Sequence, residues 1–307
     1  MAEQSKIEWT DHTFNPWEGC TKISPACDFC YAAERAARFK TVEWGGPRRR
    51  TSESNWKKPL KWEREANKFG AEFGRRQRVF CASLADVFDN QVPEEWRADL
   101  WDLIRKTPSL DWLLLTKRPQ NIEKMLPPFW DEIKGRVWLG TTVENQEVAE
   151  RNIPYLVQHD CAVRFLSCEP MLGAIDLSCI PFSGPLSPSD SAEGFHALRH
   201  VELGLDWIIA GGESGPNARS SIPRHLRSLR DQCFRAGIPF LFKQWGEWAP
   251  ASVVGNVGEI VPIDDRRGSR VGSDDMVKIG KKRAGRKLDG VICNEFPKQQ
   301  ETDHVRT

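Results

Sequence analysis

Three cysteines near the start of the chain are the residues whose type and spacing most clearly predict chemistry. Cys20, Cys27 and Cys30 lie in the segment NPWEGCTKISPACDFCYA (15–32), with the spacing C-x6-C-x2-C. Thiolates are soft ligands that suit zinc or an iron–sulfur cluster. Structural zinc normally has four protein ligands, and no fourth cysteine or histidine lies directly beside these three. The set therefore favours a [4Fe–4S] cluster with one iron free to bind a small ligand.

Other interpretations of these cysteines stay open at this point. His12 could complete a zinc site, which would make the protein a zinc-dependent enzyme, or a nucleic-acid binding module in which the metal is only structural. Buried structural cysteines could also cluster by chance. We expect the other six to pack as small apolar side chains; they are Cys81, Cys161, Cys168, Cys179, Cys233 and Cys293.

Short apolar runs that end in polar residues predict the strands that position these groups. The runs are VFCASLAD (79–86), WLLLTKR (112–118), VWLGTTVEN (137–145), VRFLSCEP (163–170), WIIAGGES (207–214) and PFLFKQWGE (239–247). Near-continuous apolar strands are typical of a parallel sheet that is covered on both faces. Helical patterns at 94–106, 146–157 and 224–237 fill the gaps, and Pro154 should shorten the second helix.

Alternation of strands and helices indicates repeated βαβ units. Together with a strand near 13–19, the six runs predict an α/β fold, a complete or partial parallel (β/α) barrel over residues 1–248. A doubly wound open sheet is the structural alternative. A stretch rich in Ser, Pro and Gly at about 178–204 should be an insertion. Residues 249–307 should be a C-terminal extension that wraps the barrel or stays partly mobile.

In a parallel barrel the active site forms at the carboxyl ends of the strands. We therefore expect the residues that follow the predicted strands to surround the cysteine loop; they are Asp86, Thr116, Lys117, Arg118, Glu144, Glu169, Glu213, Lys243 and Gln244. Lys117, Arg118, Arg219 and Lys243 could recognise an anionic substrate, although solvated strand ends would look the same. The basic run KKRAGRK (281–287) beside Lys278 could bind phosphates or be an ordinary exposed tail.

The composition of the chain is that of a soluble enzyme. Its 307 residues carry a net charge of +1, with 39% hydrophobic and 28% charged residues, which argues against a surface that coats nucleic acid but permits a local basic patch. The first residues, MAEQSKIEWTDH, lack a basic start and an apolar core, so we expect no signal peptide. No apolar run is long enough to cross a bilayer. We expect a cytoplasmic protein without membrane contacts, whose nine cysteines are mostly thiols or metal ligands.

The cysteine loop resembles that of the radical S-adenosylmethionine (SAM) superfamily, in which a three-Cys loop ending in C-x2-C-Y follows the first strand of a βα repeat. Phe29 matches the aromatic residue commonly found before the third cysteine, whereas the usual spacing in the superfamily is C-x3-C-x2-C. The whole chain more closely resembles a radical-SAM-like phage and bacterial family of unknown function. The matching segments are FNPWEGCTKISPACDFCYA (14–32), SLADVF (83–88), TKRP (116–119), LGTTVEN (139–145), SCEPMLG (167–173), GGESG (211–215), FKQWG (242–246) and KIGKKRAGRKLDG (278–290).

This resemblance implies a function and a set of site residues. Cys20, Cys27 and Cys30 would hold a [4Fe–4S] cluster whose free iron binds SAM, and reductive cleavage of SAM would give a radical that abstracts hydrogen from a substrate. The substrate would be anionic, such as a nucleotide or nucleic acid, and electrons would come from a donor such as flavodoxin or ferredoxin. SAM would contact Ser83, Asp86, Thr142, Glu144, Glu169, Gly211 and Gly212, the glycines by allowing close approach of the backbone. The substrate would contact Lys117, Arg118, Glu213, Arg219, Lys243 and Gln244.

Overall fold

The computed structural model describes residue 5 and residues 7–181, 196–199, 204–254, 259–261 and 275–298. Parts of the insertion predicted at about 178–204 and of the extension predicted at 249–307 lie outside these residues. Among the described residues, no helix is long and apolar enough to cross a membrane.

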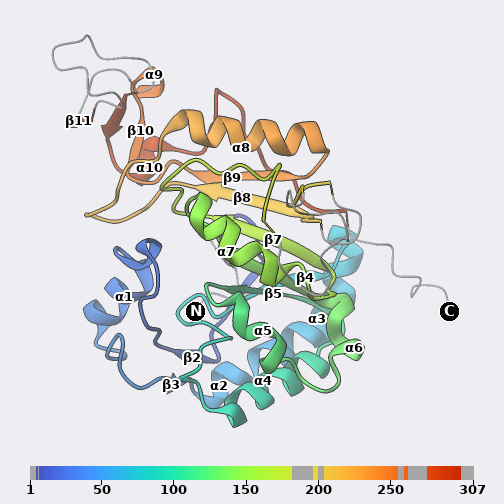
Figure 1. Cartoon of the computed structure of the whole chain (residues 1–307). Helices are drawn as coiled ribbons and strands as arrows, with labels where there is room; N and C mark the ends of the chain where they lie inside the picture. Colours follow the sequence, from blue (N-terminus) through green and yellow to red (C-terminus); the bar gives the residue numbers. More distant parts are fainter. Residues whose placement is uncertain are drawn as a thin grey trace.

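Seven parallel strands form the central sheet, in the order β1-β4-β5-β6-β7-β8-β9 (Figure 1). Their bounds are His12–Phe14 (β1), Gln77–Cys81 (β4), Leu110–Thr116 (β5), Val137–Thr142 (β6), Val163–Cys168 (β7), Trp207–Gly211 (β8) and Phe240–Gln244 (β9). This order follows the chain without a reversal, whereas a doubly wound sheet reverses its order at a switch point. Since β1 and β9 are the two edges and do not pair with each other, the sheet is a half-barrel, one of the two barrel forms predicted.

Each predicted apolar run overlaps one strand of this sheet; β4 and β5 begin two residues before their runs, and all six strands end before the runs do. The polar residues at the end of each run lie in the following loop. In the region predicted as a strand near 13–19, only β1 joins the main sheet, because β2 (Trp17–Glu18) pairs antiparallel with β3 (Arg49–Arg50).

Helices alternate with the strands. They are α1 (Tyr31–Phe39), α2 (Glu53–Trp56), α3 (Lys58–Phe73), α4 (Glu94–Arg105), α5 (Ile122–Met125), α6 (Trp130–Ile133), α7 (Gln146–Leu156) and α8 (Pro223–Ala236), with short 3₁₀ turns η1 (Pro25–Cys27), η2 (Pro119–Asn121) and η3 (Lys134–Arg136). Residues of α3, α4, α7 and α8 among them pack into the core on the outer face of the sheet. The prediction that Pro154 shortens α7 is wrong. Pro154 lies in the last turn, where it removes a single backbone hydrogen bond, and the helix continues to Leu156.

Aromatic residues fill the inner, concave face of the half-barrel. The buried cluster consists of Trp9, Phe80, Leu113, Trp138, Val163, Phe165, Trp207, Ile209 and Leu241. Trp9, which precedes β1, and Trp207 of β8 have ring centroids 6.3 Å apart, so the sheet curls until residues near its two edges meet. Gly140 of β6 makes room for Phe165, because a Cβ at this glycine would lie 2.4 Å from the ring. Trp9, Trp138 and Trp207 thus close the end of the half-barrel at which the strands begin.

The described C-terminal residues pack back onto the half-barrel. β10 (Trp248–Pro250), β11 (Glu259–Val261) and β12 (Met276–Lys278) form a small antiparallel sheet, accompanied by α9 (Ala251–Val254) and α10 (Lys281–Ala284). Asn294 then pairs with Leu241 of the edge strand β9, and the amide of Phe242 donates to the carbonyl of Cys293 at 3.0 Å. This segment covers backbone groups of β9 that an edge strand would otherwise leave exposed.

Candidate active site at the carboxyl ends of the strands

Residues 19–30, here called the cysteine loop, cross the face formed by the carboxyl ends of the parallel strands. We call this face the mouth. Residues that follow four different strands hold the loop: Tyr31 Oη donates to the carbonyl of Ser83 (2.6 Å), Arg118 Nη2 to Thr21 (2.9 Å), Arg219 Nη2 to Pro25 (2.9 Å), and the amide of Ala26 to Glu144 Oε1 (3.3 Å). The three cysteines and the strand-end residues are therefore brought to one place.

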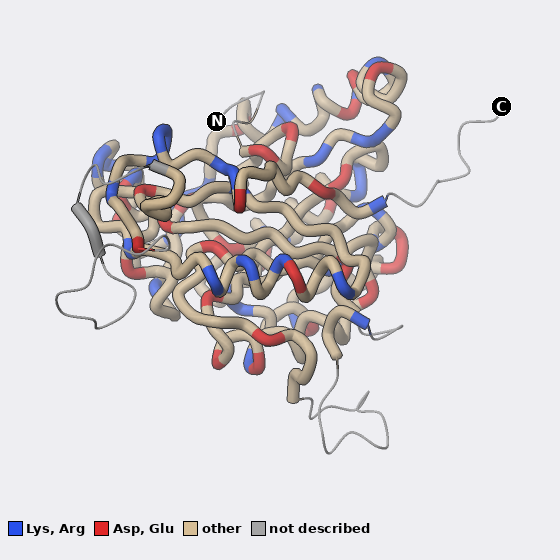
Figure 2. Tube along the Cα trace, turned by 90° about the horizontal axis from the view of Figure 1, so that it is seen from above, with Lys and Arg blue, Asp and Glu red and all other residues tan. Residues whose placement is uncertain are grey.

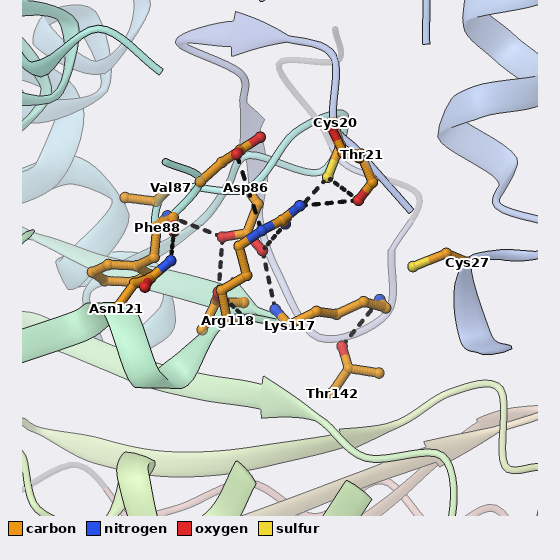
Figure 3. A network of polar contacts seen from close by, with 12 residues as sticks. Cys20, Thr21, Cys27, Asp86, Val87, Phe88, Lys117, Arg118, Asn121 and Thr142 are labelled. Carbon is orange, nitrogen blue, oxygen red and sulfur yellow. Dashed lines mark hydrogen bonds and ion pairs between the residues drawn. The ribbon is translucent and has the colours of Figure 1, made fainter. Parts of the chain in front are cut away.

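A buried arginine–carboxylate pair fixes the first part of the loop. Arg118 Nη1 donates to Asp86 Oδ2 at 3.2 Å and contacts Cys20 Sγ at 3.5 Å, and Figure 3 shows the guanidinium between these two groups. Both oxygens of Asp86 are engaged, because the Thr116 hydroxyl and the amides of Phe88 and Lys117 also donate to them. In this arrangement Asp86 orients Arg118 and has no acceptor position left for the SAM contact that was predicted.

A second pair supports the same part of the loop and was not predicted from the sequence. Arg48 donates to Asp89 Oδ2 through Nε at 2.8 Å and Nη2 at 2.5 Å, and both side chains are almost fully buried. Nη2 also donates to the Thr21 hydroxyl at 2.7 Å. Nothing in the run PRRR (47–50) distinguishes Arg48 from the two arginines that follow.

A third pair fixes the second half of the loop. Glu213 is 5% exposed and accepts from Arg219 Nε (2.9 Å), Nη2 (2.7 Å) and the backbone amide (2.8 Å). Arg219 in turn donates from Nη1 to Asp28 at 3.1 Å and lies over the Phe29 ring at 5.0 Å from its centroid. Glu213 and Arg219, which were predicted to contact substrate, clamp the segment between Cys27 and Cys30 in the structure.

The remaining cations of the mouth differ in whether a carboxylate neutralises them. Lys243 Nζ lies 2.8 Å and 2.9 Å from the two oxygens of Glu169, and Gln244 Nε2 donates to the same carboxylate at 3.1 Å. Lys117 Nζ donates to the Thr142 hydroxyl at 3.2 Å and makes no ion pair with the described residues. Lys117 was predicted to contact the substrate, and no carboxylate of the described chain neutralises its charge.

Ser83 and Tyr31 line the mouth beside the end of β4. Asn15 Nδ2 donates to Ser83 Oγ at 3.0 Å, and Asn15 Oδ1 accepts from the amide of Leu84 at 2.7 Å, which fixes the turn after the strand. Burial raises the pKa of Tyr31, and the nearby charges of Cys30 and Glu169 raise it further. The Tyr31 hydroxyl is hydrogen-bonded to Ser83, although about half of the residue's surface is exposed. Tyr31 thus lies close to both the third cysteine and the Glu169 carboxylate.

Gly211 and Gly212, the two glycines predicted to admit a ligand, lie where the strand ends pack closely. A Cβ on Gly212 would lie 1.9 Å from the carbonyl oxygen of Trp245, and one on Gly246 would lie 2.0 Å from that of Glu213. At Gly211 a Cβ would lie 3.3 Å from the carbonyl oxygen of Gln244. These contacts show that the chain segments after β8 and β9 approach each other closely, which the residues GGE alone did not reveal.

The three thiols themselves are partly exposed and belong to one loop. Cys20 Sγ contacts Arg118 and the Thr21 carbonyl (3.6 Å), Cys27 Sγ lies 3.9 Å from Ser24 Oγ, and burial raises the pKa of Cys20. Within the described ranges, no three His, Cys, Asp or Glu side chains converge closely enough to hold a metal ion. The donor set is nevertheless three thiols without a carboxylate among them, which fits an iron–sulfur cluster with one open iron better than a closed zinc site.

His12 does not lie with these thiols. Its ring stacks on Trp62 of α3 at 4.2 Å between centroids, and Nε2 lies 2.7 Å from Gln77 Oε1. The predicted role as packed apolar side chains agrees with the burial of Cys81, Cys168 and Cys233 in the core between sheet and helices, but it is wrong for Cys179, which is exposed. Burial raises the pKa of Cys233 to about 12, so it stays a thiol.

Comparison with protein families gives a match over nearly the whole chain. The model described as "Protein of unknown function (DUF5131)" matches residues 4–297. The chain belongs to the DUF5131 family. The description of DUF5131 assigns no activity and no ligand, so membership alone does not say what the chain does. A search of curated proteins finds no match to this DUF5131 chain.

Two solved structures that are similar to this DUF5131 chain are both spore photoproduct lyase. A double mutant with bound AdoMet and a dinucleoside spore photoproduct aligns with a TM-score of 0.37 and 12% identity, over 54% of this chain and 47% of that chain. A single mutant aligns with a TM-score of 0.38 and 13% identity, over 90% of this chain and 70% of that chain. The DUF5131 chain thus spans about half of the first structure, and scores this low establish neither a shared fold nor a shared activity.

Proposed function

We propose that this chain is a radical SAM-type enzyme that holds a [4Fe–4S] cluster on Cys20, Cys27 and Cys30 and acts on an anionic substrate. The observation that carries the proposal is the position of the cysteine loop. Three thiols on one loop lie across the carboxyl ends of a parallel half-barrel, where such folds place their active sites. When bound, the cluster would supply an electron for the cleavage of SAM, and the resulting radical would abstract hydrogen from the substrate.

The side chains of the mouth have separable tasks in this proposal. Arg118 and Arg219, oriented by Asp86 and Glu213, keep the two halves of the cysteine loop in place at the mouth. Burial of both carboxylates makes these pairs rigid, because charge-assisted hydrogen bonds are stronger where water is excluded. The pairs thus position the ligands and need not touch SAM or substrate.

Lys117 is the residue that we assign to an anionic group in the mouth. Its ammonium is held by Thr142 and lacks a carboxylate partner among the described residues, whereas Glu169 neutralises Lys243. Figure 3 shows Lys117 extending into the same space toward which Cys27 points. A carboxylate or phosphate of a small molecule would complete its hydrogen bonding. Lys117→Met should therefore keep the iron and weaken binding of the anion.

Anaerobic purification with cysteine variants tests the proposal. The protein should be brown, contain about four iron and four sulfide per chain, and lose both in Cys20→Ala, Cys27→Ala and Cys30→Ala. Cys233→Ala is the matched control, because this cysteine lies on the buried face of α8 and its replacement should leave the iron content unchanged. A colourless protein with stoichiometric zinc, or full iron in any of the three loop variants, would contradict the assignment.

A further inference from the structure

Three consecutive cations on α10 lack partners in the described part of the chain. Lys281, Lys282 and Arg283 are exposed, and their side chains make no hydrogen bond or ion pair with the described residues. The backbone places this short helix beside the end of β9, because the amide of Trp245 donates to the carbonyl of Gly285 at 3.1 Å. The basic run is therefore anchored at the mouth and is not a free tail.

A second group of cations lies on α1 and at its C-cap, directly after the cysteine loop. Arg35, Arg38 and Lys40 are exposed and make no ion pair with described residues. The two guanidinium groups lie 5.0 Å and 5.4 Å from the centroid of the Phe39 ring, which is 55% exposed. Together with Tyr31, which is 53% exposed, α1 therefore presents two aromatic rings next to its cations.

The loop after β8 lies between these two groups. Glu34 of α1 lies next to Gly215 of this loop, since a Cβ on Gly215 would be 3.3 Å from the Glu34 carboxylate. The amide of Gly215 donates to the Glu247 carboxylate at 3.2 Å. The amide of Gly280, which precedes α10, donates to the carbonyl of Glu247 at 3.0 Å. Figure 1 shows α1 and α10 on the same side of the molecule, the left in that view, where the mouth opens.

We propose that these two groups form a nucleic-acid binding surface, on which the phosphates of one strand contact α10 and α1 while a base stacks at Tyr31 or Phe39. Cations on two separate elements suit an extended polyanion better than one small anion, and exposed rings beside cations are the stacking platforms of single-strand binding proteins. Figure 2 shows acidic and basic residues interspersed along most of the chain. The inference deepens the proposed function by naming the class of the anionic substrate.

Fluorescence anisotropy with a labelled 20-nucleotide single-stranded DNA tests this surface in the full chain, without SAM or reductant. The logarithm of the binding constant is expected to fall linearly with the logarithm of the salt concentration. Lys281→Ala, Lys282→Ala and Arg283→Ala combined should reduce the magnitude of the slope by about 2, since each phosphate contact on a single strand contributes about 0.7. By the same relation, the affinity near 0.1 M salt should fall by about 10- to 100-fold. Tyr31→Ala should weaken binding without changing the slope.

A matched triple variant on the outside of the molecule provides the control. Arg64, Lys68 and Lys106 are exposed residues on α3 and at the end of α4, and replacing them with alanine should leave affinity and slope unchanged. No measurable binding at low salt, or an equal loss in both triple variants, overturns the surface. Competition by polyglutamate as strong as that by unlabelled DNA also overturns it, in favour of an acidic protein partner. Because neither cluster nor SAM takes part, failure to cleave SAM leaves this result standing.

Discussion

Removing the Glu213 carboxylate should loosen the cysteine loop and destabilise the fold. The burial and the partners of this carboxylate set the range of the expected loss. Glu213 is 5% exposed and makes three hydrogen bonds to Arg219, whose side chain is 29% exposed. Breaking a buried pair costs about 3–5 kcal/mol, mostly through the charge that is left unpaired. In Glu213→Ala, Arg219 keeps Asp28 and some contact with water, so we expect about 2–4 kcal/mol.

Urea denaturation of the single and double variants isolates the interaction. The coupling between Glu213→Ala and Arg219→Ala should be about 1.5–3 kcal/mol, within the range found for residues in one network. The pair Arg105–Glu132 is the matched control, since its nitrogen and oxygen lie 2.8 Å apart but both side chains are half exposed. Such surface pairs couple by less than about 1 kcal/mol. A coupling for Glu213–Arg219 no larger than that for Arg105–Glu132 would refute the clamp.

Two further predictions concern the interior of the half-barrel. Gly140→Ala should destabilise the chain by about 2–3 kcal/mol in urea titrations, because the new Cβ would overlap the enclosed Phe165 ring. Gly70→Ala in α3 is the control: no atom lies within 4 Å of the new Cβ, so this variant should be more stable by about 0.5–1 kcal/mol. Equal effects of the two substitutions would show that the Phe165 ring has room to move. Burial raises the pKa of Asp111 from 3.8 to about 6, so the folded state binds the proton more tightly than the unfolded state and stability should fall as the pH rises from 4 to 6. Asp111→Asn should remove this fall in the free energy of unfolding, which amounts to about 3 kcal/mol. A variant whose free energy of unfolding depends on pH as in the parent protein would contradict the prediction.

The sheet could be predicted from the sequence because its strands are buried on both faces. Residues such as Trp112 and Leu113 of β5 face the outer and inner cores respectively, so the run reads as continuously apolar. The curvature was harder to predict. It depends on the meeting of Trp9 with Trp207, which lie almost 200 residues apart, and no local pattern reports such a contact.

The grouping of strand-end residues at one face follows from parallel topology, but their individual roles do not. Asp86, Arg118, Glu213 and Arg219 look like ligand-binding groups in the sequence because each is charged and follows a strand. Their partners decide what they do, and these partners come from other segments, such as Thr21 and Asp28 of the cysteine loop. Only the structure separates Lys117, which lacks a carboxylate partner in the described chain, from Lys243, which has one.

Cleavage of SAM by the anaerobically prepared protein tests the central claim most directly. With dithionite and SAM, the chain loaded with its cluster should release 5′-deoxyadenosine and methionine in equal amounts, even without a substrate. Addition of SAM should change the spectrum of the reduced cluster, and Cys30→Ala should show neither product nor spectral change. A fully loaded cluster that releases no 5′-deoxyadenosine and whose spectrum does not respond to SAM would contradict the proposed function.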